Sequence, residues 1–542
     1  MSDQHYYLGI HIGHDCNVSV MDQNGNILFA AGEERFNRKK MYAGFPGMSL
    51  TNVLNTFGNE VIHLATARMR MKKKVIRELG FFTSSLVHGR AAPRFGIWLK
   101  NGFSKLFAGR TLETKVDKTG IDPEWPVCNV EHHRAHAAGA FYHSGFQSSW
   151  IMTLDGEGDG YSCCFYKADK DNGIKQIKGY YHNDVTIGRD YEKVTAMLGF
   201  HPLRHPGKIT GLAAYGQKND SCINKLSDYL ETAWKANRHK ILDASDAYQV
   251  IEQRGIEILR QDRDKVFGEF TREDIAFAVQ YLTEKKICSL IKSVIPDVQQ
   301  STICLSGGVF ANVSVNRRVK ELGFRGIFIQ PAMTDCGLSL GACMHDHPNR
   351  KLIKPADHMY LGSQFTPEDI QSVLDRNSIS YSTPANLSKH VAERLAAGKV
   401  VARFHGAMEY GPRALGNRTI MYHCGDKSVN DWLNKQLKRT EFMPFAPVTL
   451  EEYAADRYIG YEGAERTSKF MTITFKCSPQ MMEESPAVVH IDGTARPQVI
   501  GYDANPGYYD LIDSYRELTG IPTLVNTSFN MHEEPIVCSP RD

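Results

Sequence analysis

Residues 7–31, YLGIHIGHDCNVSVMDQNGNILFAA, read as three short strands joined by tight turns. An apolar strand from Tyr7 to Ile12 runs into Gly13-His14-Asp15, and a second strand follows from Asn17 to Met21. The sequence Asp22-Gln23-Asn24-Gly25 is typical of a hairpin turn, because glycine accepts the positive φ that such turns need. The remaining residues return in a third strand, so the chain is expected to begin with antiparallel hairpins.

The same pattern recurs at residues 150–166, WIMTLDGEGDGYSCCFY. Trp150 to Leu154 is an apolar strand, Asp155 to Gly160 a turn rich in glycine and aspartate, and Tyr161 to Tyr166 a second strand. Two copies of one strand–turn–strand unit indicate an internal duplication. Duplicated halves with a nucleotide between them are the plan of actin, the sugar kinases and the heat-shock ATPases. The sequence therefore predicts an α/β fold of this type for residues 1–350.

A second domain is expected after the polar stretch 345–357, HDHPNRKLIKPAD, whose two prolines are typical of a linker. Residues 366–376 predict a helix with Thr366 as its N-cap and acidic residues in its first turn. Residues 399–404 are rich in β-forming side chains. The second domain is therefore predicted to be α/β and to occupy residues 358–542.

The bulk composition excludes several classes of protein. The formal net charge is only +3, so we expect no nucleic-acid partner. No run of roughly 18 apolar residues occurs, which excludes a transmembrane helix, and the N-terminus does not read as a signal peptide. Twelve cysteines are scattered without a CxxC spacing. This usage indicates neither a disulfide framework nor a zinc knuckle, and a reducing cytoplasm is the simplest compartment.

The stretch Glu131 to Phe146, EHHRAHAAGAFYHSGF, concentrates histidines. His132 and His136 are four residues apart, so on a helix they share one face and can bind one metal ion. The HExxH zinc signature is absent because residue 133 is histidine. Buried, hydrogen-bonded histidines are the alternative interpretation. Asp335, in the turn PAMTDCGLSLGA, is a candidate third ligand, and two histidines with one carboxylate suit iron or another divalent transition metal.

Glycine-rich turns recur where a nucleotide would bind. Backbone N–H groups in such turns, and at a following helix N-terminus, can contact phosphate oxygens. Besides the turn at Gly13-His14-Asp15, they lie in residues 205–211 and 305–312, and each alone also reads as a plain turn. The nucleotide-binding candidates in these two stretches are Gly207, Lys208, Gly211, Gly307, Gly308 and Asn312.

Arginine and amide side chains form a further group of candidates in the second domain. They lie in EYGPRALGNR (409–418), RTEFMPFAP (439–447), HIDGTARPQ (490–498) and NTSFN (526–530). Arginine binds phosphate through two parallel hydrogen bonds, and serine and asparagine supply neutral donors. A surface ion pair is the alternative for any one arginine, but the repetition favours an anionic ligand. The candidates are Arg413, Arg418, Arg439, Arg496, Asn526, Ser528 and Asn530.

Residues 68–110 are strongly basic, with eleven lysines and arginines, one acid (Glu78) and interleaved aromatic residues. The pattern predicts an amphipathic helical insert with a solvated basic face. A cap that holds an anionic or amphiphilic acceptor, and a peripheral membrane contact, are the alternatives.

Taken together, the motifs resemble one family over nearly the whole chain. HHRAHAA (132–138), TLDGEGDG (153–160), LSGGVFANVSVN (305–316) and the four second-domain motifs are similar to those of the nodulation and antibiotic-biosynthesis O-carbamoyltransferases. The hydrogenase-maturation carbamoyltransferase and the tRNA threonylcarbamoyl-transfer proteins are more distant relatives. The resemblance implies that residues 358–542 are similar to threonylcarbamoyl-adenylate synthase.

The resemblance also implies a two-step reaction. The second domain would condense carbamoyl phosphate with ATP, supplied with Mg²⁺, to give carbamoyl adenylate, and the first would transfer the carbamoyl group to an acceptor hydroxyl. His132, His136 and Asp335 would hold iron, and the glycine turns would grip the adenylate. His14 and Asp15 would be catalytic, with His14 as the base. The arginine and amide candidates would form the adenylation site.

Several expectations follow for the rest of the protein. Family members usually continue further past NTSFN, so the resemblance implies a second domain truncated at Asp542. We expect a homodimer and a hydroxyl acceptor, a sugar or natural product of anionic character if the basic insert contacts it. A hydroxyl kinase of the sugar-kinase fold and a nucleotide-dependent interaction protein are the competing functions. The nucleotide products would distinguish all three.

Overall fold

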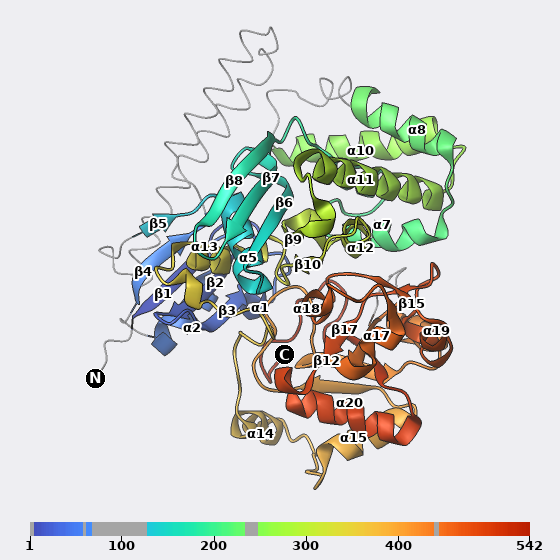
Figure 1. Ribbon diagram of the computed structural model, residues 1–542. Coiled ribbons are helices and arrows are strands. Elements are labelled where there is room, and N and C mark those ends of the chain that lie inside the picture. Colours follow the sequence, from blue (N-terminus) through green and yellow to red (C-terminus); the bar gives the residue numbers. More distant parts are fainter. Residues whose placement is uncertain (1–4, 58–60, 68–126, 234–247, 438–443) are drawn as a thin grey trace.

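The computed structural model describes residues 5–57, 61–67, 127–233, 248–437 and 444–542 (Figure 1). The basic insert expected at 68–110, and Arg439, lie outside these ranges. Within them, none of the helices combines the length and apolarity needed to cross a bilayer.

The first sheet contains the strands expected at the start of the chain. Its order is β3-β2-β1-β4-β5, with β1 and β2 antiparallel, β2 and β3 antiparallel, and β4 and β5 parallel to β1. Gly25 closes the β2–β3 hairpin with a φ of 78°, the positive value that the sequence predicts for this turn. The strands are β1 (Tyr6–His11), β2 (Asn17–Asp22), β3 (Ile27–Gly32), β4 (Val61–Thr66) and β5 (Val127–Asn129).

The second sheet repeats the topology of the first. Its order is β8-β7-β6-β9-β10, with two antiparallel pairs on one side of β6 and two parallel pairs on the other. The predicted duplication and the actin-like plan of the N-terminal domain are therefore confirmed. The strands are β6 (Ser148–Gly158), β7 (Tyr161–Asp169), β8 (Gly173–Tyr181), β9 (Thr302–Ser306) and β10 (Gly326–Ile329).

Two helices in equivalent positions lie between the sheets. Helix α13 (Leu338–Asp346) packs on β1, β2 and β4, helix α5 (His132–Ser144) packs on β6, β7, β9 and β10, and the helices pack against each other. Their approach depends on small residues, because a Cβ on Gly341 would lie 2.1 Å from the carbonyl oxygen of Ala135. Small residues such as Ala135 and Gly341 thus let the histidine helix lie buried in the centre of the domain.

The other helices of this domain lie at its edges. A helical lobe between β8 and β9 has its own apolar core, which includes Val194, Leu226, Leu259 and Phe267 (Figure 1). Its helices are α6 (Ile187–Met197), α7 (Pro206–Leu212), α8 (Asp220–Asp228), α10 (Tyr248–Phe267) and α11 (Arg272–Val294). Also among the described residues of this domain are α1 (Glu34–Asn37), α2 (Gly47–Phe57) and α12 (Val313–Lys320).

The C-terminal part is α/β, as predicted. A sheet of order β11-β12-β18-β13-β17 carries α15 and α20 packed together on one side, and a small sheet, β14-β15-β16, lies beside it. Thr366 caps α14 with a complete capping box. The strands are β11 (Val401–Phe404), β12 (Arg418–His423), β13 (Ala446–Leu450), β14 (Tyr458–Ile459), β15 (Phe475–Cys477), β16 (Thr494–Ala495), β17 (Gln498–Ile500) and β18 (Thr523–Ser528). The helices are α14 (Pro367–Arg376), α15 (Leu387–Ala396), α16 (Ser428–Gln436), α17 (Ala454–Arg457), α18 (Glu465–Ser468), α19 (Pro479–Glu484) and α20 (Pro506–Thr519).

The two parts of the chain are joined by hydrogen bonds as well as by the linker. Asn316 donates to the carbonyl of Thr472 at 2.7 Å, and the hydroxyl of Tyr410 donates to the carbonyl of Cys336. The division between residues 350 and 358 and the likeness of the second domain to threonylcarbamoyl-adenylate synthase stay predictions.

Candidate functional site

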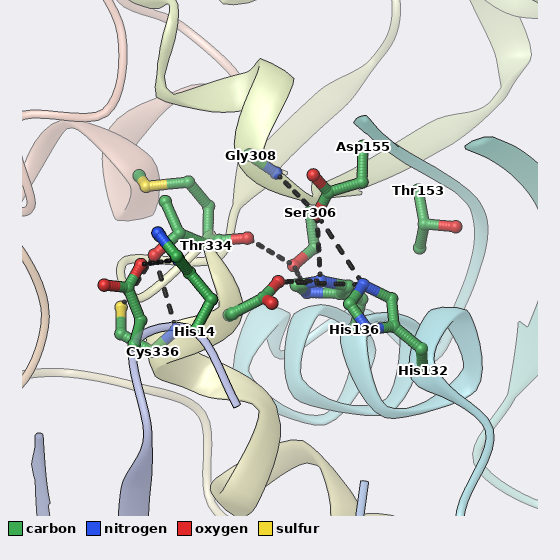
Figure 2. A network of polar contacts seen from close by, with 12 residues as sticks. His14, His132, His136, Thr153, Asp155, Ser306, Gly308, Thr334 and Cys336 are labelled. Atoms are coloured by element: carbon green, nitrogen blue, oxygen red, sulfur yellow. Dashed lines mark hydrogen bonds and ion pairs between the residues drawn. The ribbon is translucent and has the colours of Figure 1, made fainter. Parts of the chain in front are cut away.

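Two of the four histidines of α5, His132 and His136, face two carboxylates at the centre of the N-terminal domain (Figure 2). The Nε2 of His132 lies 3.7 Å from an oxygen of Asp155 and 3.7 Å from one of Asp335. The Nε2 of His136 lies 3.4 Å and 3.7 Å from the same two oxygens. The sequence prediction placed His132, His136 and Asp335 together, and the structure does so.

Local structure holds each ligand candidate in place. A Cβ on Gly158 would lie 2.1 Å from the ring of His132, so only glycine at this point of β6 leaves room for that ring. The Nδ1 of His136 lies 3.0 Å from the hydroxyl of Ser306, at the end of β9. The backbone N–H of Gly308 donates to Asp155 at 3.1 Å. The cluster therefore depends on both the α5 helix and the ends of β6 and β9.

The donor set fits a divalent transition metal. The Nε2 atoms of His132 and His136 are buried and have no hydrogen-bond partner among the described residues, although both point at carboxylates. If the Nδ1 of His136 donates to Ser306, its Nε2 is left with a free lone pair, which is the arrangement of a metal-bound histidine. Two imidazoles with two carboxylates suit iron or zinc better than magnesium.

Opposite charges within the cluster shift the pKa values of its members. Burial alone would lower the pKa of His132, but the charges of Asp335 and Asp155 outweigh it and raise that pKa to about 9. Burial would raise the pKa values of Asp155 and Asp335, yet the histidines hold both below the ordinary value. A bound cation would replace the proton on the His132 ring.

Asp155 was missed as a ligand candidate by the sequence reasoning. The sequence assigns it only to the turn in DGEGDG, yet it lies in the last part of β6, directly after the apolar residues 150–154, much as the Gly13-His14-Asp15 turn follows β1. The duplication was the signal that could have found it, because the turns that follow the apolar residues of β1 and β6 line the same cavity.

The predicted catalytic pair lies beside the cluster, at the end of β1. The Nδ1 of His14 lies 3.3 Å from a carboxylate oxygen of Asp15. The hydrogen bond to Asp15 raises the pKa of His14, even though burial opposes it. His14 is 40% exposed on its side chain, so its ring reaches open space and its proton can exchange with a bound molecule.

A large cavity of about 2570 Å³ extends from this point to the C-terminal domain. On the N-terminal side its lining includes the catalytic pair, the two carboxylates of the cluster and the turn at Gly308. On the C-terminal side it includes Arg413, Ser528 and Asn530. The structure thus brings candidates from both halves of the sequence around one space.

The glycine-rich stretches differ in their outcome. Gly307 (φ 110°) and Gly308 form the expected tight turn after β9, and Asn312 caps α12 by accepting the N–H of Val315 at 3.1 Å. The stretch after His205 is a helix, α7, and not the predicted turn, because Pro206 at its first position favours helix. Gly207 lines the cavity, as do Gly308 and Asn312.

The other two nucleotide-binding candidates in α7, Lys208 and Gly211, are buried. Gly211 is buried, and Lys208 is only 6% exposed with its ammonium 6.0 Å from the centre of the Phe200 ring. Lys208 therefore lies in the helical lobe, among apolar residues.

The arginine candidates also separate into two groups. Arg413 lines the cavity, whereas Arg418 is fully buried, stacks on Phe404 at 3.7 Å and donates to the carbonyls of His405 and Gly406. Burial lowers the pKa of Arg418 to about 10. These contacts favour a structural role for Arg418 over the phosphate contact expected from the sequence.

The amide candidates of β18 separate in the same way. Asn526 is buried and donates to Gln498 at 2.7 Å, while Ser528 donates to Asn530 at 2.5 Å at the cavity wall. Arg496 lies between β16 and β17, outside the group that lines the cavity.

Glu409 organises the loop that carries Arg413 and was not predicted. One carboxylate oxygen accepts the backbone N–H groups of Leu415 and Asn417 at 2.8 Å and of Arg418 at 3.0 Å. The glutamate at the head of EYGPRALGNR thus folds the loop around itself. An acid in front of a Gly-Pro turn carries no clear sequence signal for this role.

Glu192, on α6, is a second carboxylate that the sequence reasoning missed. It lines the cavity, and one of its oxygens lies 3.3 Å from where a Cβ of Gly156 would stand. The neighbouring cations are paired elsewhere: Arg189 with Glu157 at 3.4 Å and Lys193 with Asp190 at 2.8 Å. Burial therefore dominates and raises the pKa of Glu192 to about 7.

Two family models match the chain. One, described as carbamoyltransferase N-terminus, matches residues 6–344, and the other, carbamoyltransferase C-terminus, matches residues 392–542. Nodulation protein NolNO of Sinorhizobium fredii is 27% identical over 98% of this chain and 76% of that protein. Nodulation protein NolO of Bradyrhizobium diazoefficiens is 30% identical over 76% of this chain and 75% of that protein. An uncharacterized protein of Methanocaldococcus jannaschii is 28% identical over 99% of this chain and 95% of its own length.

Likeness to solved structures is more distant. Full-length HypF in its phosphate- and nucleotide-bound form aligns with 63% of this chain and 46% of its own, at 14% identity and a TM-score of 0.30. The activator of the 2-hydroxyisocaproyl-CoA dehydratase from Clostridium difficile aligns with 64% of this chain and 96% of its own, at 11% identity and a TM-score of 0.35. The two family models, in contrast, cover most of the sequence. The chain therefore belongs to the carbamoyltransferase family of transferase enzymes.

Proposed function

We propose that the protein is an ATP-dependent O-carbamoyltransferase. The C-terminal domain makes carbamoyl adenylate from carbamoyl phosphate and ATP with Mg²⁺, and the N-terminal domain passes the carbamoyl group to an acceptor hydroxyl. One observation supports this scheme above the others: a single cavity of about 2570 Å³ is lined by Arg413, Ser528 and Asn530 at one end and by His14 and Asp335 at the other. An activated intermediate formed at the first end can reach the second through this one cavity.

The chemistry of the cavity suits each half-reaction. Arg413 offers a planar pair of donors to phosphate oxygens, and Ser528 and Asn530 add neutral hydrogen-bonding groups. At the other end, His14 takes the proton of the attacking hydroxyl, and Asp15 stabilises the imidazolium that results. Moving the carbamoyl group onto AMP provides a large handle whose binding energy positions the reacting carbon.

The metal is proposed to act at the transfer end. His132, His136, Asp155 and Asp335 would hold a divalent transition metal, iron by the family resemblance, which stabilises negative charge that develops on the carbamoyl or phosphate oxygens. The orphaned Nε2 atoms and the two carboxylates support this assignment.

The acceptor is proposed to be a hydroxyl of a sugar or natural product, with an anionic group if the basic residues 68–110 contact it. Cytoplasmic location and a homodimer remain expectations from the sequence.

The first experiment supplies purified protein with ATP, Mg²⁺ and carbamoyl phosphate, and no acceptor. Pyrophosphate that forms only when carbamoyl phosphate is present, together with the mass of carbamoyl adenylate, is the expected result. Formation of ADP without pyrophosphate would instead support the hydroxyl kinase or ATPase that the duplicated fold also accommodates.

A further inference from the structure

We infer that Arg35, a residue of the N-terminal domain, is a positioning residue for the adenylation site in the C-terminal domain. The inference rests on the proposed function, because it concerns the residues that would make carbamoyl adenylate. It predicts that the first half-reaction, which the sequence assigns to the C-terminal domain alone, depends on a side chain of the other domain.

Arg35 reaches across the domain boundary with a buried charge. It lies in α1, its side chain is only 5% exposed, and its guanidinium donates to the carbonyl of Gly411 at 2.8 Å. Its nearest carboxylate is Glu34, at 3.7 Å from its Nε. A buried guanidinium needs a charge partner and acceptors for its N–H groups, and Glu34 and the Gly411 carbonyl supply one of each.

The carbonyl that Arg35 holds belongs to the loop of Arg413. Gly411 has a φ of 110°, which favours glycine, and it stands two residues before Arg413. Glu409 grips the same loop from within, through the backbone N–H groups that follow Arg413. The loop is thus fixed at two points, one on each side of Arg413, and the N-terminal domain supplies one of them.

The same short helix holds a second wall of the cavity. Arg38, at the end of α1, donates to the carbonyls of Pro535 and Ile536, both at 2.8 Å. Pro535 and Ile536 line the cavity, as do Gly411 and Arg35. Helix α1 therefore ties together the two C-terminal segments that bracket the proposed adenylation site.

Removal of the Arg35 guanidinium should let the loop drift and move Arg413 away from the phosphate. Since a displacement of about 1 Å in a positioning group can reduce a rate about 100-fold, Arg35→Ala should lower kcat for pyrophosphate formation about 10- to 100-fold. KM for ATP should change less, because Arg35 is inferred to act through the loop of Arg413 and not on the nucleotide itself. Arg35→Lys keeps one donor for the Gly411 carbonyl and should recover part of the rate.

The test compares wild type, Arg35→Ala and Arg35→Lys in the acceptor-free pyrophosphate assay. Thr467→Val is the matched control: it removes another inter-domain hydrogen bond, from the N–H of Ile329 to Thr467 at 3.0 Å, between residues outside the cavity lining. Metal content and thermal midpoint are measured for every variant, so that a loss of fold is separated from a loss of alignment.

The outcomes distinguish the inference from the proposed function. If wild type makes no pyrophosphate with carbamoyl phosphate, the proposed function fails. If wild type is active and Arg35→Ala keeps its kcat, the inference is overturned. It is also overturned if Thr467→Val loses as much activity, since the effect would then reflect docking in general. Should Arg35→Ala not fold, the Lys variant decides: kcat reduced at an unchanged thermal midpoint supports positioning, and wild-type kcat refutes it.

Discussion

Glu192 makes the stability of the protein depend on pH in a predictable direction. Its pKa lies at about 7 in the folded protein, because burial disfavours the charged form, against an ordinary value of 4.5. The unfolded state therefore releases this proton first as the pH rises. Below about pH 4.5 the ionisation of Glu192 does not affect the free energy of unfolding. Between about pH 4.5 and 7 it lowers that free energy progressively. Above about pH 7 the penalty is complete.

The magnitude follows from the same two values. One pH unit of pKa displacement corresponds to 1.36 kcal/mol, so a change from 4.5 to about 7 corresponds to about 3 kcal/mol of unfolding free energy. Between about pH 5 and about pH 8, roughly 2–3 kcal/mol of this should develop. Glu192→Gln keeps the shape and removes the titration, so its stability relative to wild type should rise by that amount over this interval.

The assay is guanidinium unfolding of wild type and Glu192→Gln at the two pH values, after removal of metal with EDTA. Metal removal matters because a cation near Asp155 would favour the ionised form of Glu192. Glu157→Gln is the control, since Glu157 lines the same cavity but is partly exposed and paired with Arg189. A stability difference between Glu192→Gln and wild type that is the same at both pH values would refute the reasoning.

Three further perturbations test the site. Asp155→Asn should weaken Fe²⁺ or Zn²⁺ binding at least about 10-fold in a metal titration, while pyrophosphate formation continues; an unchanged metal affinity would exclude Asp155 as a ligand. Gly158→Ala should displace the ring of His132 and also reduce metal content, whereas Gly207→Ala, which meets no atom within 4 Å, should leave it unchanged; equal metal content in the two would contradict the close packing. Glu409→Ala leaves three backbone N–H groups without their acceptor and should lower the free energy of unfolding by about 2–4 kcal/mol. Urea unfolding measures this change, and a variant as stable as wild type would contradict the prediction.

The fold was predictable where the local pattern is strong. The strand–turn–strand units at 7–31 and 150–166 carry turn residues with a mechanical role, such as Gly25, and both sheets formed around them. The glycines after His205 predict a turn, but this stretch forms helix α7, because Pro206 stabilises the first turn of a helix. Composition alone does not decide between these two effects.

The site was predictable only in part, for a physical reason. His132 and His136 share a helix, so their spacing alone brings them together. Asp155 joins them from β6, and Glu192 reaches the same cavity from α6, and no spacing in the sequence records either placement. Arg418 shows the reverse case. Its guanidinium donates to the backbone carbonyls of His405 and Gly406, so an arginine in a recognisable motif can have a structural role.

The hydrogen bonds between the domains have an evolutionary consequence. Arg35 and Arg38 donate to carbonyl oxygens of the C-terminal domain, as Asn316 does, and the N–H of Ile327 donates to the carbonyl of Gly463. Main-chain acceptors survive almost any substitution of the residue that bears them. The C-terminal side of these four contacts can therefore diverge in its side chains without losing the acceptor atoms, unlike the contact of Ile329, whose acceptor is the hydroxyl of Thr467.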